Sequence, residues 1–580
     1  MPALKSREDK IFAFALLILF IVFNHNLGLM PLLADEPTRA LVSLEMLLRN
    51  NYIFPTLGNE AYLNKPPLFN WILAGVMYLI KDYREWHLRI ISIIPFFMIA
   101  ITHYIVVSKE VNKKVALWSS LAFLTCGRIL FYDSMMAYID PLFSLFIVLN
   151  VYWIFIQSRK PLSLRFFILS YILCLLAFFL KGLPALSFQA CTLLTICIYR
   201  KKAASLISLN HLAGIATFLI FTSIYYYEYA AYADTSMLFT KIVSQSSQRT
   251  PIATSIADTL MHLIQFPAQF ILDFCPFSLF ILFAFRKNAL STLKENEFIF
   301  LSVLFFVSNI WLYWISAETR ARYLFMFLPM FFTVAFYMYE KYKSLLSKKI
   351  IRLLVLILSA TLIVTLIVLS CLQRFSFIDH KELLIAGLIL IIVVFILFNY
   401  RYAIQNVLSI AIILTLLRIT FNFYILPLRE KESPESTNKI VGQQLGSYVN
   451  KERLTIINRA PVNHDILYYM TKERAALVEQ DCIKDTPQKY LKNKKQVLTI
   501  SADSLLAYSI KENFKDTLLV SDSIFNRVQK RVLDEWATRR NNLPDGYYIC
   551  TQTDLIRYKL KPIHFFNVTY ESQTLALAKK

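Results

Sequence analysis

The sequence has 580 residues, of which 57% are hydrophobic and only 17% are charged, a balance that excludes an ordinary soluble globular protein. Glycine occurs only 10 times and there is no low-complexity tract, so fibrous and disordered classes are excluded as well. The formal net charge of +22 would suggest nucleic acid in a soluble protein, but membrane proteins concentrate lysine and arginine in short cytoplasmic loops, so we expect no nucleic-acid partner.

Apolar segments long enough to cross about 30 Å of hydrocarbon recur along the chain before residue 426. We expect about thirteen membrane-spanning helices, at 11–33, 87–108, 115–132, 138–157, 164–180, 183–199, 209–228, 266–285, 297–316, 322–340, 351–372, 383–399 and 404–424. The first segment is too long for the core of a signal peptide and lacks a small-residue cleavage site. We therefore expect it not to be cleaved and to form the first membrane span. The sequence therefore predicts an α-helical polytopic protein surrounded by membrane lipids.

The apolar segment Pro67–Ile80 would reach only about 21 Å as a helix, and whether it spans decides the topology. If it does not span, the basic N-terminus and every strongly basic short loop face the cytoplasm; if it does, all later loops invert. These loops contain Lys109, Lys113 and Lys114; Arg159, Lys160 and Arg165; Arg200–Lys202; Arg286, Lys287 and Lys294; Lys341–Arg352; and Arg401. We therefore expect 67–80 to lie at the outer surface, with Trp71 and Tyr78 at the interface.

After about Leu426 the composition becomes polar and mixed. We predict helices near 435–449 and 503–511, and short strands at Leu454–Asn458, Val497–Ser501, Leu518–Val520 and Tyr547–Cys550. Residues 1–425 would thus form a transmembrane domain, and residues 426–580 a soluble α/β domain. An odd number of spans places this second domain outside the cytoplasm.

Two cysteines, Cys482 and Cys550, fall in the predicted soluble domain. An extracytoplasmic location permits oxidation, and we expect the two to form a disulfide. The alternative is that both are free thiols, because the distance between them is not encoded in their spacing.

Three polar sites beside apolar spans share the predicted outer face. The first is Asp35-Glu36-Pro37-Thr38-Arg39, the second Asn64-Lys65-Pro66-Pro67, and the third Tyr138-Ile139-Asp140-Pro141. Each has an ordinary structural interpretation, because an acid before proline is typical of a helix start and an interfacial lysine can extend to the headgroups. Their accumulation at one face favours a reaction site.

Sugar transfer from a polyprenyl phosphate needs this combination of groups. A carboxylate can take the proton of the acceptor hydroxyl, and fixed cations can hold the phosphate and absorb its charge as it leaves. The lipid tail of the donor also requires a site that opens to the bilayer at headgroup depth, where these residues are expected.

Further motifs follow in order. Asp35–Arg39 with Glu45-Met46-Leu47 is similar to D-E-x-x-R … E-M-L, and Tyr62–Leu68 with Trp71 to Y-F-E-K-P-P-L … W. Ile139-Asp140-Pro141 matches L-D-P, Lys181-Gly182 matches T-K-G, Gln248-Arg249 matches H-I-Q-R, and Arg322-Tyr323 with Leu328-Pro329 lies near K-L-P-T-Y. Over about the first 340 residues the chain resembles the aminoarabinose transferase group, which is close to the protein O-mannosyltransferases and has the GT-C fold.

The resemblance implies a bacterial inner-membrane glycosyltransferase with a cytoplasmic N-terminus and a periplasmic C-terminal domain. It would move a sugar from a polyprenyl-phosphate donor to lipid A, a glycan or a protein. It also implies roles for individual residues. By matching positions, Asp35 is the acceptor-side base and Asp140 assists it; Lys65, Arg249 and Tyr323 hold the donor phosphate; Glu36, Arg39, Lys181, Arg320 and Arg322 support the site, Arg320 being offset by one residue from the motif.

Two departures from the family pattern concern metal binding. Asn64 and Ser246 stand where relatives carry a glutamate and a histidine that could share a metal ion. Both ligands are missing together, so we expect a site without a metal or other cofactor.

Two other classes of protein compete with an enzyme. A polytopic transporter or flippase of a lipid-linked substrate would place polar residues and broken helices near the bilayer midplane, whereas these carboxylates stay at one surface. A binding protein anchored by the membrane region would not need thirteen spans.

Overall fold

The computed structural model describes residues 6–58, 60–232, 256–378, 381–402, 406–457, 460, 462–481, 543, 545–570 and 573–580. These residues form two compact units. The helical unit comprises the described residues of 1–30, 84–219 and 245–432, and the mixed unit those of 31–83, 220–244 and 433–580. The division into domains at residue 425, predicted from the sequence, stays a prediction.

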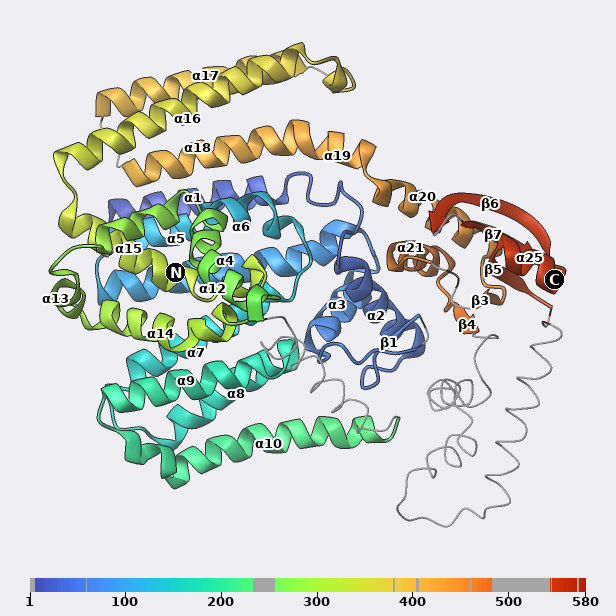
Figure 1. Cartoon of the computed structure of the whole chain (residues 1–580), viewed down its shortest axis with the longest axis horizontal. Helices are drawn as coiled ribbons and strands as arrows, with labels where there is room; N and C mark the ends of the chain where they lie inside the picture. Colours follow the sequence, from blue (N-terminus) through green and yellow to red (C-terminus); the bar gives the residue numbers. More distant parts are fainter. Residues whose placement is uncertain are drawn as a thin grey trace. The chain divides into compact units, whose positions relative to one another are not determined.

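The helical unit contains most of the apolar helices (Figure 1). Its helices are α1 (Arg7–Asn24), α4 (Glu85–Glu110), α5 (Lys113–Thr125), α6 (Gly127–Phe131), α7 (Asp140–Gln157), α8 (Leu164–Lys181), α9 (Pro184–Tyr199), the first part of α10 (Leu209–Ala230), α12 (Ile256–Asp273), α13 (Ala289–Lys294), α14 (Glu297–Trp314), α15 (Leu328–Tyr342), α16 (Leu345–Cys371), α17 (Lys381–Tyr402), α18 (Asn406–Thr420) and α19 (Leu426–Glu432). Short 3-10 turns lie at Asp133–Met135, Ala203–Ile207, Phe277–Ala284, Ala321–Leu324 and Gln373–Phe375, and a π-helical turn at Phe421–Ile425.

Seven helices in the described part of the chain are long and apolar enough to cross a membrane. They are Glu85–Glu110, Asp140–Gln157, Leu164–Lys181, Leu209–Ala230, Glu297–Trp314, Ser347–Leu369 and Val407–Glu432, and the pair Lys113–Thr125 and Gly127–Met135, bent by 41°, would make an eighth. The polytopic helical class is confirmed, but the count of about thirteen is not.

Short or interrupted helices account for the lower count. α9 has 16 residues and α15 has 15. The predicted span 266–285 is not one helix, because α12 ends at Asp273 and a 3-10 helix begins at Phe277. Pro276 lies in the break, where its missing N–H cannot continue a helical ladder.

Loop residues begin several of these helices by capping their free N–H groups. Asn112, Ser163 and Asn296 accept from the backbone N–H three residues later, at the starts of α5, α8 and α14. Ser6 and Ser344 form capping boxes at α1 and α16. The polar loop residues thus fix where each apolar helix starts.

A buried polar cluster joins four helices in the core of the helical unit. His103 of α4 lies 2.5 Å from the hydroxyl of Tyr152 on α7 and 2.8 Å from that of Ser119 on α5. The hydroxyl of Thr333 on α15 lies 2.9 Å from the same imidazole. Because buried polar atoms need partners, these contacts fix the mutual register of α4, α5, α7 and α15.

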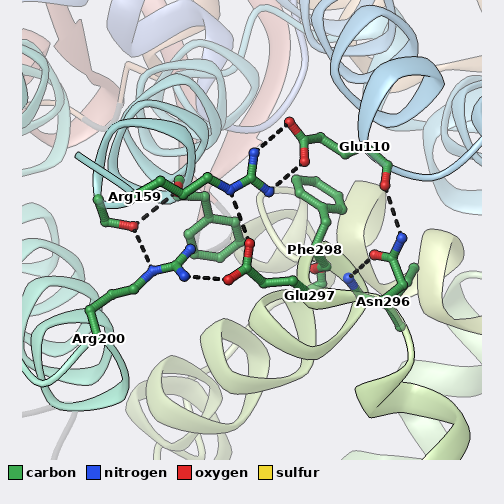
Figure 2. A network of polar contacts seen from close by, with 10 residues as sticks. Glu110, Arg159, Arg200, Asn296, Glu297 and Phe298 are labelled. Carbon is green, nitrogen blue, oxygen red and sulfur yellow. Dashed lines mark hydrogen bonds and ion pairs between the residues drawn. The ribbon is translucent and has the colours of Figure 1, made fainter.

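Charged residues from the predicted cytoplasmic loops meet at one end of the helical unit. Figure 2 shows Arg159, after α7, donating to both carboxylate oxygens of Glu110 at 3.0 and 2.6 Å and to Glu297 at 2.9 Å. Arg200, after α9, also pairs with Glu297, and Asn296 donates to the carbonyl of Glu110 at 2.9 Å. The ends of α4, α7, α9 and α14 are therefore joined in one network.

Other segments from the predicted cytoplasmic side reach the same helix ends. Lys113 pairs with Asp9 at 2.7 Å, and its neighbour Lys114 pairs with Glu340 at 2.8 Å. Lys341 pairs with Glu295, two residues before α14, at 2.7 Å. These loops, which the charge pattern assigns to one side of the membrane, do lie at a common end of the unit.

The mixed unit combines helices with two sheets. Its elements are α2 (Glu36–Arg49), β1 (Thr56–Leu57), β2 (Glu60–Ala61), α3 (Leu68–Ile80), α20 (Pro434–Val449), β3 (Leu454–Ile457), α21 (His464–Arg474), β4 (Glu479–Asp481), β5 (Tyr547–Thr551), α25 (Gln552–Tyr558), β6 (Lys561–Tyr570) and β7 (Gln573–Lys579). β1 and β2 form a hairpin, and the others form a five-stranded sheet in the order β4-β3-β5-β7-β6.

The sheet is mixed in direction. β3 runs parallel to both β4 and β5, while β7 is antiparallel to β5 and β6. The predictions of a helix near 435–449 and of strands at 454–458 and 547–550 are confirmed. The strands and helix predicted at 497–501, 518–520 and 503–511 lie outside the described residues. β6 and β7 were not predicted, because the adjacent pair Phe565-Phe566 breaks the alternation in β6 and Leu575–Ala578 in β7 is a continuous apolar run.

The predicted disulfide stays a prediction. Cys550 is buried in β5, and its sulfur lies 3.8 Å from the carbonyl oxygen of Ala576. Cys482 lies outside the described residues.

Candidate active site

The predicted site residues fall into two groups, one in each unit, and each group has its own geometry. In the mixed unit, Asp35 directly precedes α2 and is exposed, and its side chain makes no capping hydrogen bond to that helix. Glu36, by contrast, is 1% exposed and its Oε2 accepts from the backbone N–H of Leu33 at 2.8 Å. The two adjacent carboxylates therefore differ: Glu36 fixes the loop, and Asp35 stands at its surface.

Arg39 and Tyr62 connect α2 to the loop before α3. Nη1 of Arg39 donates to the hydroxyl of Tyr62, and both residues are buried. Burial raises the pKa of the Tyr62 hydroxyl above its ordinary value, while the Arg39 charge acts in the opposite direction. The hydroxyl thus stays protonated at neutral pH. The charge of Asp35 also acts on Tyr62, so all three groups belong to one electrostatic neighbourhood.

Glu45 holds the β1–β2 hairpin against α2. Its carboxylate is 3% exposed and accepts from the hydroxyl of Thr56 at 2.5 Å and from the N–H of Gly58 at 2.7 Å. Asn70 of α3 donates to the carbonyl of Arg39 at 3.1 Å. These bonds fix both ends of the segment that carries Lys65, which is half-buried between β2 and α3.

In the helical unit, Asp140 forms a buried ion cluster. It is the first residue of α7 and 6% exposed. Lys181, the last residue of α8, donates to Oδ1 at 2.5 Å, and Nε of Arg322 lies 3.4 Å from Oδ2. Two cations thus share one carboxylate, and the cluster carries excess positive charge.

Aromatic rings border the cations of this Asp140 cluster. The ammonium of Lys181 lies 3.7 Å from the ring centre of Tyr323, and the guanidinium of Arg322 lies 4.2 Å from that of Tyr138. Cations over the faces of aromatic rings are stabilised without being neutralised. The structure therefore brings together Asp140, Lys181, Arg322 and Tyr323, four of the predicted site residues.

A second buried acid lies near this cluster and was not predicted. Asp133 is fully buried, pairs with Arg128 at 2.8 Å, and interacts electrostatically with Asp140 and Arg322. Tyr138 and Glu45 belong to the predicted motifs, but no contact of either side chain was predicted from the sequence. A buried acid of this kind has no sequence signal of its own beyond an aspartate next to apolar residues.

Of the remaining predicted site residues, Arg320 is described by the structure and Arg249 is not. Arg320 is exposed, and its carbonyl accepts from the N–H of Tyr323 at 2.9 Å. Arg249 and Ser246 lie outside the described residues. Within the described ranges no group of three or more histidine, cysteine, aspartate and glutamate side chains could hold a metal ion.

Comparison with known proteins gives two kinds of match. The family model of dolichyl-phosphate-mannose-protein mannosyltransferases matches residues 64–227. An undecaprenyl phosphate-alpha-4-amino-4-deoxy-L-arabinose arabinosyl transferase from Photorhabdus laumondii is 28% identical over 227 residues, and a transferase of the same description from Proteus mirabilis is 25% identical over 226. Each match covers 37% of this chain, and the chain spans 40% of the length of each relative.

Solved structures match along nearly the whole chain. The crystal structure of ArnT from Cupriavidus metallidurans bound to undecaprenyl phosphate superposes with a TM-score of 0.66 at 12% identity, covering 99% of this chain and 98% of that one. Its apo state gives a TM-score of 0.61 at 13% identity, with 98% and 97% covered. The chain therefore shares the fold of these two structures and belongs to the class of polytopic helical membrane proteins.

Within that class the chain resembles the aminoarabinose transferases. The resemblance inferred from the ordered motifs is confirmed by the matched relatives and by the fold.

Proposed function

We propose that this chain is a membrane glycosyltransferase that moves a sugar from a polyprenyl-phosphate donor to a hydroxyl of lipid A, another glycan or a protein. The undecaprenyl-phosphate-linked aminoarabinose named for the matched relatives is the donor to test first, which would make the enzyme a pentosyltransferase. The observation that carries the proposal is the contrast between two motif aspartates: Asp35 is exposed, whereas Asp140 is buried between two cations.

This contrast suggests separate roles. A base must reach the acceptor, and the exposed carboxylate of Asp35 can accept the proton of an acceptor hydroxyl. Both carboxylate oxygens of Asp140 face cations. We therefore assign Asp140 the role of holding Lys181 and Arg322 in position. The excess positive charge of the Asp140 cluster suits the phosphate that leaves with the bonding electron pair of the broken sugar–oxygen bond. Lys65, Arg249 and Tyr323 are proposed as further phosphate contacts.

No metal is needed in this mechanism. Asn64 stands in the turn before α3 in place of the family's glutamate, and a neutral amide is a poorer ligand for a divalent cation than a carboxylate. The cations of the chain itself would carry the charge of the phosphate.

We further propose that the chain spans the inner membrane about thirteen times, with a cytoplasmic N-terminus and residues 426–580 outside. The common end reached by the basic loops supports this, since the positive-inside rule then assigns that end to the cytoplasm.

Asp35→Asn tests the assignment in proteoliposomes supplied with undecaprenyl-phosphate-linked aminoarabinose and lipid A. Loss of the base should slow transfer by about 10²–10⁴-fold. Binding of undecaprenyl phosphate should be unchanged, because the amide keeps the size of the side chain. Asp82→Asn, in the same unit but outside the motif, is the matched control. Near-normal turnover of the Asp35 variant would remove Asp35 as the base.

A further inference from the structure

The loop that carries Asp35 has a conformation that its own sequence does not favour. Ala34 has a φ of +52°, in the left-handed region that side chains other than glycine rarely adopt. Such a residue persists only where the surrounding structure over-determines it. The contacts that hold Leu32, Leu33 and Ala34 therefore also decide where Asp35 is placed.

One of these contacts comes from the C-terminal part of the mixed unit. The backbone N–H of Leu32 donates to the hydroxyl of Tyr469 on α21 at 2.9 Å. Leu32 and Tyr469 are both fully buried, so the loss of this bond would leave a buried N–H without that acceptor. Together with the bond from Leu33 to Glu36, it fixes the two residues before Ala34.

Two more side chains of α21 contact the same region. Nδ1 of His464 lies 3.0 Å from the hydroxyl of Thr38, which is part of the Asp35 motif. The hydroxyl of Tyr468 donates to the carbonyl of Tyr83 at 2.8 Å, three residues beyond the end of α3. Helix α21 thus contacts the Asp35 loop on both sides of Asp35 and also the segment after α3.

Helix α21 is itself placed by close packing on α20. A Cβ atom on Gly442 would lie 2.7 Å from the carbonyl oxygen of Ile466, and one on Gly446 would lie 2.5 Å from the Cβ of Glu473. Glycine at both positions lets the two helices approach this closely, and a larger residue would have to displace α21. The position of Tyr469 therefore depends on α20 as well.

We propose that helix α21 is a positioning element of the active site, and that Tyr469 is a positioning residue that holds the Asp35 loop in its reactive conformation. The inference rests on the proposed function of Asp35 as the base. It assigns a catalytic contribution to the C-terminal segment, which would act through the backbone of Leu32 and would not touch the substrate.

The test compares Tyr469→Phe with Tyr448→Phe in the full-length protein in lipid nanodiscs. Tyr448 is an exposed tyrosine on α20 whose ring packs near His564 and not on the loop. Hydrogen exchange of the peptide covering residues 31–36 should become faster in Tyr469→Phe and stay unchanged in Tyr448→Phe. Gly442→Ala, which displaces α21 by a different route, should reproduce the faster exchange.

The kinetic arm uses undecaprenyl-phosphate-linked aminoarabinose and lipid A. Tyr469→Phe should lower kcat by about tenfold or more, because misplacing a reacting group by about 1 Å is enough for such a loss, with KM for the donor unchanged. Unchanged exchange at 31–36, or faster exchange with unchanged kcat, would overturn the proposal. A wild-type protein that transfers no sugar would instead contradict the proposed function, and the exchange arm would still decide whether Tyr469 holds the loop.

Discussion

Asp35 and Asp140 have similar local sequences and opposite environments. Each lies one or two residues before a proline at the start of a helix, the pattern of a capping acid. Neither side chain caps its helix: Asp35 is exposed, and Asp140 pairs with cations from α8 and from the 3-10 turn before α15. At the scale of single residues, the environment of each carboxylate separates the proposed base from the proposed positioning group.

Removal of one partner from the Asp140 cluster should destabilise the protein. The side chains of Lys181 and Asp140 are 5% and 9% exposed, so Lys181→Met leaves a buried carboxylate with Arg322 as its remaining cation. We expect a loss of about 3 kcal/mol, the lower end of the range for breaking a buried pair. Lys341→Met is the control, because its pair with Glu295 is exposed to solvent and should contribute much less.

Thermal unfolding in detergent measures this difference. The melting temperature should fall clearly more for Lys181→Met than for Lys341→Met. Equal shifts would mean that the buried pair contributes no more than a surface pair.

Lys65 should contribute to donor binding and not to folding. Lys65→Ala removes a charge-assisted contact to phosphate, which is worth about 1.5–3 kcal/mol, or roughly tenfold to hundredfold in affinity. Lys81→Ala, at the opposite end of α3, is the matched control. Titration of each variant with undecaprenyl phosphate gives the affinities, and an unchanged Kd for Lys65→Ala would exclude Lys65 from the phosphate site.

At the scale of secondary-structure elements, the membrane topology depends on whether helix α3 spans the bilayer. It has 13 residues, so it reaches only about 20 Å, and it is absent from the helices long enough to cross a membrane. Its start is fixed by the bond from Asn70 to Arg39 on α2. Helix α3 therefore belongs to the mixed unit. The charge pattern did not predict this membership; it predicts that 67–80 lies at the outer surface without spanning the membrane.

Single cysteines with a membrane-impermeant reagent test this topology in cells. Cysteines at positions 82 and 435 should be labelled from outside, because both positions follow outward-facing segments in the proposed orientation. A cysteine at position 113 should not, because Lys113 lies at the common end of the basic loops. Labelling at 113 from outside would invert the orientation and make 67–80 a span.

At the scale of the whole molecule, we expect sugar transfer to proceed without a divalent metal. Asn64 and Ser246 replace two residues that could share a metal ion in relatives, and the proposed phosphate contacts are side-chain cations. Dialysis against EDTA should therefore leave the transfer rate unchanged. A loss of rate that is restored by Mn²⁺ or Zn²⁺ would contradict this expectation, and undecaprenyl phosphate binding measured in parallel would show whether the metal acts on the donor.

The sequence by itself determined the membrane class, the positions of most apolar helices and the residue types of the candidate site. These follow from local properties: the length of an apolar segment, the charge of each loop, and the order of short motifs. The strands β6 and β7 were missed because neighbouring apolar residues interrupt their apolar–polar alternation, and because a position in a sheet depends on which strands pair.

Only the tertiary structure decided which of the candidate site residues contact one another. Lys181 pairs with Asp140 across 41 positions, and Tyr469 accepts from Leu32 across 437. Contacts between residues so far apart leave no periodic pattern in the sequence, because their energy comes from packing and from burial of charge. For this reason the motifs predicted Asp140 as an assisting acid, whereas its buried ion pairs favour a positioning role, and the part played by α21 could be inferred only from the fold.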